Sequence, residues 1–439
     1  MEDIKENSTN IVLSYLKKFL EGRINNLSQS DRKNPKIYHY YIEIVRNWSK
    51  LNFIVNKTLR SLKINDVEDK LEFAKYLFSA YRIIWENALL EDINTEIPLK
   101  NTRILSRFKT FSMDKALDGK SKDERLSIQE AIPTFVIQHL SNVMSIDFLK
   151  DNIKAMNRIG EKKDFTVYMN KTIEKILNLC AIGNLQKYIN LKEPLFRKDP
   201  HISFIYNIPS KYKSEIINSD LYKSGDLIIQ DKASATVVYI LSPQPNEFIC
   251  DMCAAPGMKT SLISHYTENK TKIIAGEFLL NRAYQMKDLM NRQNISNSYI
   301  INTDSIKLPV RFENLFDKVL LDAPCTGSGT FLTNPELKWR QNENFLYQNI
   351  TLQKKLLASA LKLLKPQGIL VYSTCSLYPE EGELQILDII DKVEPMELPK
   401  WLSPSYEIEG KILQGTGRLF PSVHQTQGFF IGKFKKKKR

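Results

Sequence analysis

The chain has 439 residues, of which 42% are hydrophobic and 26% charged, so it can bury the cores of two or three domains and is not disordered. Its longest apolar runs fall short of the roughly 20 residues that a bilayer-spanning helix needs. The opening residues, MEDIKENSTN, are polar and acidic and lack the apolar stretch of a secretory signal. We therefore expect a cytoplasmic protein without a membrane segment.

Lysine and arginine together number 63 and the acidic residues 50, which gives a formal net charge of +13. Such an excess is typical of a protein that contacts phosphate backbones, although a solubilising surface has the same composition. The last segment, GKFKKKKR, is almost entirely basic. It either binds nucleic acid or forms a solvated end, and the sequence leaves both interpretations open.

The cysteines are few and scattered, and their odd number argues against a disulfide framework. No CxxC pair is accompanied by a second pair or by a histidine cluster, so we predict no metal site. The five cysteines are Cys180, Cys250, Cys253, Cys325 and Cys375.

The first 120 residues repeat apolar side chains with the period of a helix, as Leu13, Leu16 and Leu20 illustrate. Asn65 and Asp66 supply helix-start chemistry before the apolar run VEDKLEFAKYLF. The run SQSDRKNP has the composition of a loop. This part of the chain is predicted to be an all-helical domain.

Residues 121–225 mix a helix, PTFVIQHLSNVM, with the short strands FTVYMN and ISFIYNI, and form a predicted small α+β module. In residues 226–439, apolar strands alternate with helical stretches, which is typical of an α/β fold with a doubly wound parallel sheet. The predicted strands are EFICDM, KIIAGEF, NSYIIN, DKVLLD, GILVYS and GFFIGKF.

The first of these strands ends in the small-residue loop DMCAAPGMKT, which continues directly into a helix. Such a loop lets backbone amides approach a ligand at the carboxyl edge of the sheet. Glu277 closes the second strand, where a carboxylate can hold ribose hydroxyls, and Asp304 follows the third. Because neither GxxxxGKT nor GxGxxG is present, we expect a nucleoside without a polyphosphate, and S-adenosylmethionine fits this description.

The fourth and fifth strands end in LLDAPCTGSGT and VYSTCSLYPEE. Adjacent parallel strands end at the same edge, so Asp322, Cys325 and Cys375 are expected to converge on the ligand crevice. A single buried cysteine is usually only a small apolar residue. Two cysteines in neighbouring loops at this edge indicate a catalytic role.

The motifs DMCAAPGMKT, GEF, NTD, LDAPCTGSG, NPELKWR and YSTCSLYPEEGE resemble those of the Sun/Fmu (NOL) family of RNA cytosine-5 methyltransferases. QDKASATVV and RLFPSVHQTQGFFIGKF also resemble this family, and the resemblance spans residues 125–434. The helical domain is similar in layout to the NusB-like, RNA-binding domain of the same family. The resemblance implies a Rossmann-like methyltransferase domain that uses S-adenosylmethionine.

The resemblance also implies a role for each matching residue. Cys375 would attack carbon 6 of cytosine, because carbon 5 is not nucleophilic until that bond forms. Asp322 would stabilise or protonate the ring at nitrogen 3, and Cys325 would assist proton removal and release of the enzyme. The residues expected to hold the donor are Cys253, Ala254, Ala255, Pro256, Gly257, Met258, Lys259, Glu277, Asp304 and Asp322.

The resemblance implies an RNA partner, with small-subunit ribosomal RNA favoured and transfer RNA second, and we expect a monomer that needs no metal. Two other functions remain open. A DNA cytosine-5 methyltransferase would attack with Cys325, although the STC motif around Cys375 argues against it. A non-catalytic RNA-binding protein of ribosome assembly would not need both cysteines.

Overall fold

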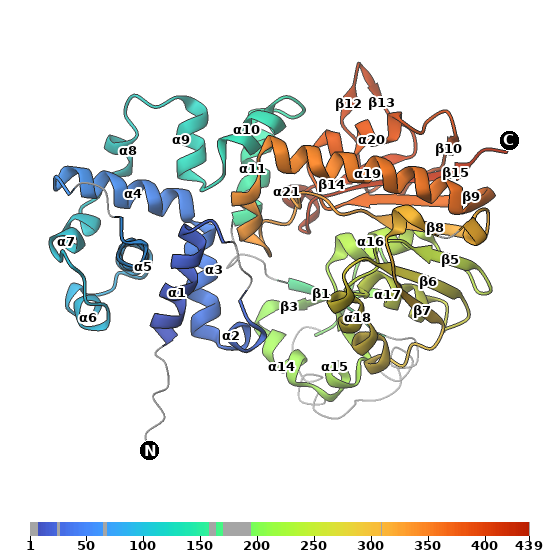
Figure 1. Ribbon diagram of the computed structural model, residues 1–439, viewed down its shortest axis with the longest axis horizontal. Coiled ribbons are helices and arrows are strands. Elements are labelled where there is room, and N and C mark those ends of the chain that lie inside the picture. Colours follow the sequence, from blue (N-terminus) through green and yellow to red (C-terminus); the bar gives the residue numbers. More distant parts are fainter. Residues whose placement is uncertain are drawn as a thin grey trace. The chain divides into compact units, whose positions relative to one another are not determined.

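The structure is a computed structural model that describes residues 8–23, 27–64, 68–157, 164–169, 195–308 and 310–438 (Figure 1). The chain forms two compact units, which we call the helical unit (Met1–Asn142 with Thr333–Gln341) and the sheet unit (Val143–Leu332 with Asn342–Arg439). The division into residues 1–120, 121–225 and 226–439 stays a prediction. Cys180, Asn65 and Asp66 lie outside the described residues.

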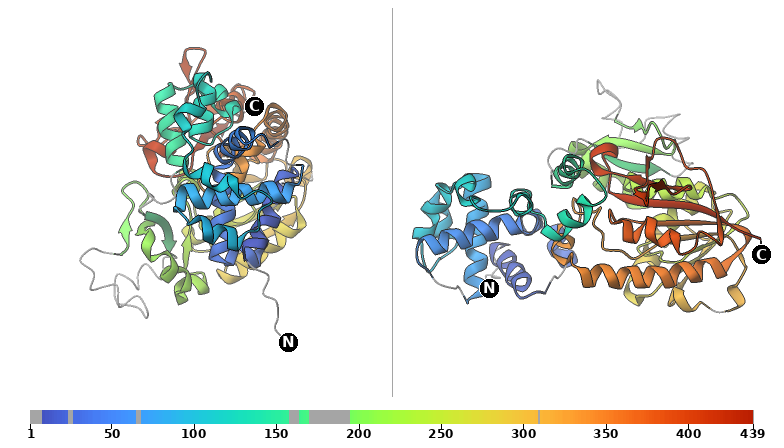
Figure 2. Two further views of the ribbon diagram at one scale, coloured as in Figure 1. Left: turned by 90° about the vertical axis from the view of Figure 1, so that its left-hand side faces the viewer. Right: turned by 90° about the horizontal axis from the view of Figure 1, so that it is seen from above.

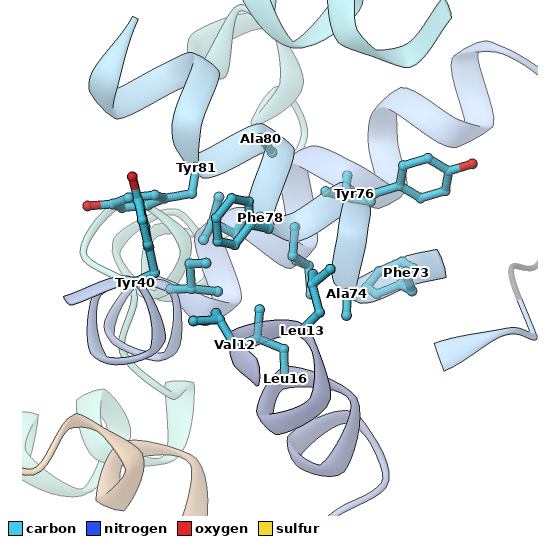
Figure 3. Close-up of a cluster of buried hydrophobic side chains, with 14 of the residues drawn as sticks. Val12, Leu13, Leu16, Tyr40, Phe73, Ala74, Tyr76, Phe78, Ala80 and Tyr81 are labelled. Carbon is cyan, nitrogen blue, oxygen red and sulfur yellow. The ribbon is translucent and has the colours of Figure 1, made fainter. Parts of the chain in front are cut away.

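The helical unit packs its helices around one apolar core. Helix α1 buries Val12, Leu13, Leu16 and Phe19, which share one side of the helix. Figure 3 shows Val12, Leu13 and Leu16 facing the side chains of α5, among them Phe78. The described helices of this unit are α1 (Ser8–Leu20), α2 (Gln29–Lys33), α3 (Pro35–Arg46), α4 (Trp48–Ser61), α5 (Lys70–Glu86), α6 (Leu90–Glu96), α7 (Arg103–Lys109), α8 (Met113–Ala116), α9 (Lys122–Gln129) and α10 (Thr134–Ser141).

Helix α2 lies within SQSDRKNP, so the prediction of a loop there was wrong. The Oγ atom of Ser28 caps this helix by accepting a hydrogen bond from the Asp31 N–H at 3.1 Å. A helix of five polar residues has no apolar period that could reveal it. Helix α5 is capped by Asp69, whose Oδ1 accepts from the Leu71 N–H at 2.9 Å.

The motif NPELKWR contributes the 3₁₀ helix η5 (Pro335–Arg340) to the helical unit. The Nε1 atom of Trp339 donates to the Val45 carbonyl at 2.7 Å, and Nζ of Lys338 donates to the Arg46 carbonyl at 3.1 Å. These carbonyls belong to the last turn of α3, where a helix leaves acceptors without intrahelical partners. Lys338 is fully buried, and its Nζ also donates to the Ala131 carbonyl at 3.1 Å. Two side chains of η5 therefore cap α3.

The main sheet of the sheet unit has the strand order β11-β14-β15-β9-β8-β5-β6-β7, and β10 pairs with β15. Strands β5 to β9 are parallel, whereas β15 runs antiparallel to β9. The strands are β5 (Phe248–Asp251), β6 (Lys272–Glu277), β7 (Ser298–Asn302), β8 (Phe316–Asp322), β9 (Leu364–Thr374), β10 (Val393–Pro395), β11 (Ser403–Pro404), β14 (Thr416–Leu419) and β15 (Phe429–Lys436). The predicted Rossmann-like α/β fold is confirmed, but GFFIGKF, which was predicted with the strands of the parallel sheet, forms the antiparallel strand β15.

The middle residues of the parallel strands are largely apolar because both faces of the sheet are covered by helices (Figures 1 and 2). Ile249 and Cys250 of β5 belong to two different core clusters, since successive residues of a strand point to opposite faces. The described helices of this unit are α11 (Ile146–Asn157), α14 (Lys213–Asn218), α15 (Asp220–Ser224), α16 (Lys232–Leu241), α17 (Met258–Tyr266), α18 (Leu280–Arg292), α19 (Glu343–Leu363), α20 (Glu383–Leu387) and α21 (Pro421–His424).

A second, antiparallel sheet of the same unit has the order β2-β3-β1-β4. It contains the two short strands predicted for this part of the chain. Its strands are β1 (Asp164–Met169), β2 (Arg197–Lys198), β3 (Ile205–Pro209) and β4 (Leu227–Ile229), and a separate hairpin is formed by β12 (Glu407–Ile408) and β13 (Lys411–Ile412). Within the described residues, no helix combines the length and apolar character that crossing a bilayer requires.

Candidate active site

The loop after β5 is held tightly against its neighbours. Gly257 has a φ of +101°, a backbone conformation that residues with a side chain rarely adopt, so the turn favours glycine. The Ala254 N–H donates to the Gly276 carbonyl at 2.9 Å, which fixes the loop to strand β6. The loop lies beside the point between β5 and β8 where the strand order reverses, and doubly wound sheets bind their ligands at such a point.

Asp251, the last residue of β5, is buried beneath this loop. Its Oδ2 accepts a hydrogen bond from Oγ1 of Thr260 at 2.7 Å. Burial raises the pKa of Asp251 to about 6, with the charge of Asp322 acting in the same direction and the bond from Thr260 opposing it. The charge on Asp251 therefore changes close to neutral pH.

Glu277 ends β6, and its carboxylate is 5% exposed. Its Oε1 accepts from the Leu279 N–H at 2.8 Å, and its Oε2 lies 3.6 Å from Nη1 of Arg282. The Nη2 atom of Arg282 donates to the Ala255 carbonyl at 2.6 Å. Arg282, which sequence reasoning missed, therefore links the carboxylate to the glycine-containing loop.

Asp304 follows β7 and caps the 3₁₀ helix η3 (Ser305–Lys307), because its Oδ1 accepts from the Ile306 N–H at 3.0 Å. Oγ of Ser305 donates to the Met252 carbonyl at 2.5 Å. The end of the third parallel strand is thus joined to the loop after the first.

Asp322 lies at the end of β8 between two donors. Nζ of Lys259 donates to its Oδ2 at 2.6 Å, and Oγ of Ser373 donates to its Oδ1 at 2.7 Å. Burial alone would lower the pKa of Lys259, but the charge of Asp322 and the hydrogen bond to it outweigh burial and raise that pKa. Lys259 therefore stays charged and fixes the orientation of the Asp322 carboxylate.

Cys325 and Cys375 meet at the same edge, with their Sγ atoms 3.2 Å apart. Cys325 lies in the loop after β8, and Cys375 directly follows β9. The hydrogen bond to Cys375 and burial raise the pKa of the Cys325 thiol well above its ordinary value. Cys325 thus keeps its proton in the resting protein and can donate it toward the Cys375 sulfur.

The loop that carries Cys325 is anchored by a buried carboxylate, Glu381. The Thr326 N–H donates to Oε1 of Glu381 at 2.9 Å, and Nε2 of Gln353 donates to the same oxygen at 3.0 Å. Gln353 also donates to the Pro324 carbonyl at 2.8 Å. Hydrogen bonds to Pro324 and Thr326, the residues before and after Cys325, thus limit the movement of this loop.

The loop that carries Cys375 is anchored by a fully buried ion pair between Arg418 and Glu383. Nη2 of Arg418 lies 2.5 Å from Oε2 of Glu383, and Nη1 donates to the Ser376 carbonyl at 3.0 Å. The geometry is bidentate, because Nε of Arg418 also donates to Oε1 of Glu383 at 2.7 Å. The residue that follows Cys375 is therefore held by a guanidinium group whose own position is fixed.

Two glycines bring the cysteine loops together. The Gly329 N–H donates to the Cys375 carbonyl at 3.0 Å, and the Gly428 N–H donates to the Gly329 carbonyl at 2.9 Å. A Cβ atom at Gly329 would lie 2.1 Å from the Gly428 carbonyl oxygen, so a side chain there would force the loops apart.

The structure places every predicted site residue in the loops or helix starts that follow β5, β6, β7, β8 and β9, or at the last residue of one of these strands. Burial raises the pKa of Cys253 well above its ordinary value, so this residue is a neutral thiol within the loop. Among the described residues, no three histidine, cysteine or acidic side chains gather as a metal site would require.

Sequence reasoning did not assign Arg282, Ser373, Glu381 or Arg418. Glu381 and Arg418 lie in the motifs YSTCSLYPEEGE and RLFPSVHQTQGFFIGKF, which was the available signal. Ser373 also lies in YSTCSLYPEEGE, whereas Arg282 is recognisable only from its contacts in the fold.

The profile of the family described as 16S rRNA methyltransferase RsmB/F matches residues 238–435. A tRNA (cytosine(49)-C(5))-methyltransferase of Pyrococcus abyssi is 32% identical over 307 residues, which make up 66% of this chain and 98% of that protein. The chain belongs to the Sun/Fmu family of RNA (cytosine-5)-methyltransferases.

The chain is also 36% identical over 224 residues to a probable ribosomal RNA small subunit methyltransferase B of Synechocystis sp., and the match covers 49% of each chain. The crystal structure of the protein PH0851 has the same fold, with a TM-score of 0.72 at 24% identity over 97% of this chain and 98% of that one. The resemblance to the Sun/Fmu family is confirmed. The chain is therefore an S-adenosylmethionine-dependent RNA (cytosine-5)-methyltransferase.

Proposed function

We propose that this enzyme forms 5-methylcytosine through a covalent bond between Cys375 and carbon 6 of the target cytosine. The observation that carries this proposal is the 3.2 Å approach of the Cys325 and Cys375 sulfurs at the strand ends beside Asp322. Two thiols in contact at one edge suit a reaction in which one sulfur attacks and the other assists its release.

The proposed reaction consists of attack at carbon 6, methyl transfer to carbon 5 and release of Cys375. The Cys375 thiolate forms a bond to carbon 6, and the electron pair of the double bond moves into the ring toward nitrogen 3, where Asp322 stabilises or protonates the ring. Carbon 5 becomes nucleophilic and takes the methyl group as the sulfur–methyl bond of the donor breaks, which leaves the donor as a neutral thioether. The carbon 5 proton then passes to solvent, its electron pair restores the double bond, and the bond between carbon 6 and sulfur breaks. Cys325, a neutral thiol 3.2 Å away, assists this release by donating a hydrogen bond to the departing Cys375 thiolate.

The residues at this edge fit S-adenosylmethionine, which when bound supplies the methyl group as an electrophile. We assign the loop from Cys253 to Lys259, with Glu277, Asp304 and Asp322, to its binding. The cations here are paired with acids, Lys259 with Asp322 and Arg282 with Glu277. That pairing suits a nucleoside better than a polyphosphate, and buried carboxylates suit a sulfonium cation.

The proposed substrate is ribosomal RNA of the small subunit, which the description of the matching family supports. Transfer RNA is the second candidate, because a relative that matches over nearly its whole length is named as a transfer RNA methyltransferase. Bisulfite sequencing of total RNA from cells with and without the gene distinguishes the two. A cytosine that loses its methyl group only in ribosomal RNA supports the first substrate.

The covalent mechanism is tested with two cysteine variants. Cys325→Ser forms the bond to carbon 6 but resolves it poorly, so it should accumulate a protein–RNA complex on a denaturing gel. Cys375→Ser cannot form that bond and should show no such complex. A complex from Cys375→Ser and none from Cys325→Ser would reverse the assignment and make Cys325 the nucleophile, as in a DNA-type mechanism.

If neither variant forms a complex while the unmodified enzyme methylates RNA, a covalent cysteine mechanism is wrong.

A further inference from the structure

A groove of about 590 Å³ lies between the C-terminal half of α19 and the end of β15. Figures 1 and 2 show that this helix and the last strand run toward the same end of the sheet unit, where the C-terminus lies. We call this feature the lysine groove, because half of its lining residues are lysines. They are Lys354, Lys362, Lys392, Lys436, Lys437 and Lys438.

Helical spacing explains one wall of the lysine groove. The exposed side of α19 carries Lys354, Ala358 and Lys362, which follow one another at intervals of four residues. Leu357 and Leu361 of the same helix are buried beneath them. The two lysines are separated by about 12 Å along the helix axis, at 1.5 Å per residue.

The positive charge of the lysine groove is not cancelled within it. Six lysines face two aspartates in the lining, which leaves a formal surplus of four positive charges. Lys354 pairs with Asp388 at 2.9 Å. Lys437 Nζ donates to the Asp391 backbone carbonyl at 3.0 Å, and Lys436 Nζ donates to the Leu364 carbonyl at 2.8 Å. Carbonyl partners orient an ammonium group without neutralising it.

The lysine groove is separate from the candidate active site. In the β9–β15 ladder, Phe430 lies opposite Thr374, next to the catalytic cysteine, whereas Lys435 lies opposite Ile369. Five residues of strand span about 17 Å. The groove therefore lies at the opposite edge of the sheet from Cys375 and belongs to neither the donor loop nor the cysteine loops.

We propose that the lysine groove binds the sugar-phosphate backbone of the RNA substrate, outside the nucleotide that is methylated. The floor consists of Leu357, Leu361 and Ile389, and the described residues that line the groove include no aromatic ring on which a base could stack. Interactions there are consequently with phosphates and independent of sequence. This inference rests on the proposed function, and it gives the basic end of the chain a role in RNA binding.

The test replaces four exposed lysines of the groove, Lys362, Lys392, Lys437 and Lys438, by glutamine. The probe is a fluorescein-labelled 30-nucleotide oligouridylate, and binding is measured by anisotropy at several salt concentrations. We expect affinity to fall on the order of tenfold or more at physiological salt. The slope of log affinity against log salt should decrease by about 0.7 for each phosphate that the variant no longer neutralises.

A matched control replaces four exposed lysines elsewhere in the sheet unit, Lys154, Lys272, Lys287 and Lys411, by glutamine. It removes the same charge and should change the affinity and the slope much less. Equal losses in both variants would mean that net charge, not the groove, binds RNA, and would overturn the proposal. An unchanged oligouridylate affinity combined with lost binding of polyglutamate would assign the groove to an acidic protein instead.

A second readout separates this proposal from the proposed function. The groove variant in a Cys325→Ser background should still form the covalent complex at saturating total RNA. If the complex forms and RNA affinity is unchanged, the groove proposal alone fails. If no complex forms in the Cys325→Ser protein with its groove intact, the covalent mechanism fails, whatever the groove binds.

Discussion

Lys259 and Asp322 form an ion pair of 2.6 Å that joins the first turn of α17 to the end of β8. The two residues are 63 positions apart in the chain. Ser373 completes the arrangement from β9, so three neighbouring parallel strands determine the position of one carboxylate. Because that carboxylate lies between the donor loop and the cysteine loops, the ion pair couples the proposed donor site to the proposed nucleophile.

Replacing Lys259 by methionine should lower the rate of methyl transfer by about tenfold to a hundredfold. A charge-assisted hydrogen bond is worth on the order of 1.5–3 kcal/mol, and Asp322 loses both its orientation and its counter-charge. The measurement is single-turnover transfer of labelled methyl groups to total RNA from cells that lack the gene. Lys259→Arg keeps the charge and should retain most of the rate. Equal losses in both variants would show that the charge is not what matters.

Replacing Glu277 by glutamine should weaken S-adenosylmethionine binding by about tenfold to a hundredfold, because the carboxylate proposed to hold the ribose hydroxyls is lost. Calorimetry with the donor alone measures this without RNA. Asp288→Asn, an exposed site on α18, is the control and should bind normally. Unchanged binding by the Glu277 variant would place the donor elsewhere.

Asp251 should make the stability of the ligand-free protein fall as pH rises from about 4 to 6. Its pKa is raised by burial from 3.8 to about 6, so the folded state binds more protons than the unfolded state within this window. The stabilisation is complete below about pH 4 and is lost above about pH 6, a change on the order of 3 kcal/mol.

Thermal unfolding of the Asp251→Asn variant tests this prediction. The variant cannot ionise at this position, so its Tm should rise relative to that of the unmodified protein as the pH increases from about 4 to about 7. If the Tm of the variant and the Tm of the unmodified protein change with pH in the same way over this range, Asp251 does not titrate there.

Lys338→Met should loosen the end of α3. The substitution leaves the Arg46 and Ala131 carbonyls buried without this donor, at a cost of about 1–3 kcal/mol for each group. Hydrogen exchange of the α3 amides is the suitable measurement, because a protein of two units need not unfold in one step. Lys109→Met, at an exposed position of α7, should leave this exchange unchanged.

Trp339→Phe gives a graded comparison, since it keeps an aromatic ring and removes only the Nε1 donor to the Val45 carbonyl. Its effect on α3 exchange should be smaller than that of Lys338→Met. Exchange that is unaffected by either substitution would show that η5 does not cap the helix.

Several features of the molecule followed from the sequence by itself. The apolar runs separated by helical stretches predicted the parallel strands. Parallel strands have their carboxyl ends at the same edge of the sheet. The sequence therefore predicted that Asp322, Cys325 and Cys375 share an edge of the sheet. The helices of the N-terminal segment followed from their apolar period, whereas the short polar α2 did not, because only its cap at Ser28 marks it.

The tertiary structure decided which side chains meet. The two cysteines are 50 positions apart, Lys259 and Asp322 are 63 apart, and Trp339 and Val45 are 294 apart. Periodicity reports only neighbours within a few residues, since it arises from local helix and strand geometry. Contacts at long range depend on how strands and loops pack, so the 3.2 Å approach of the sulfurs and the capping of α3 by NPELKWR became visible only in the fold.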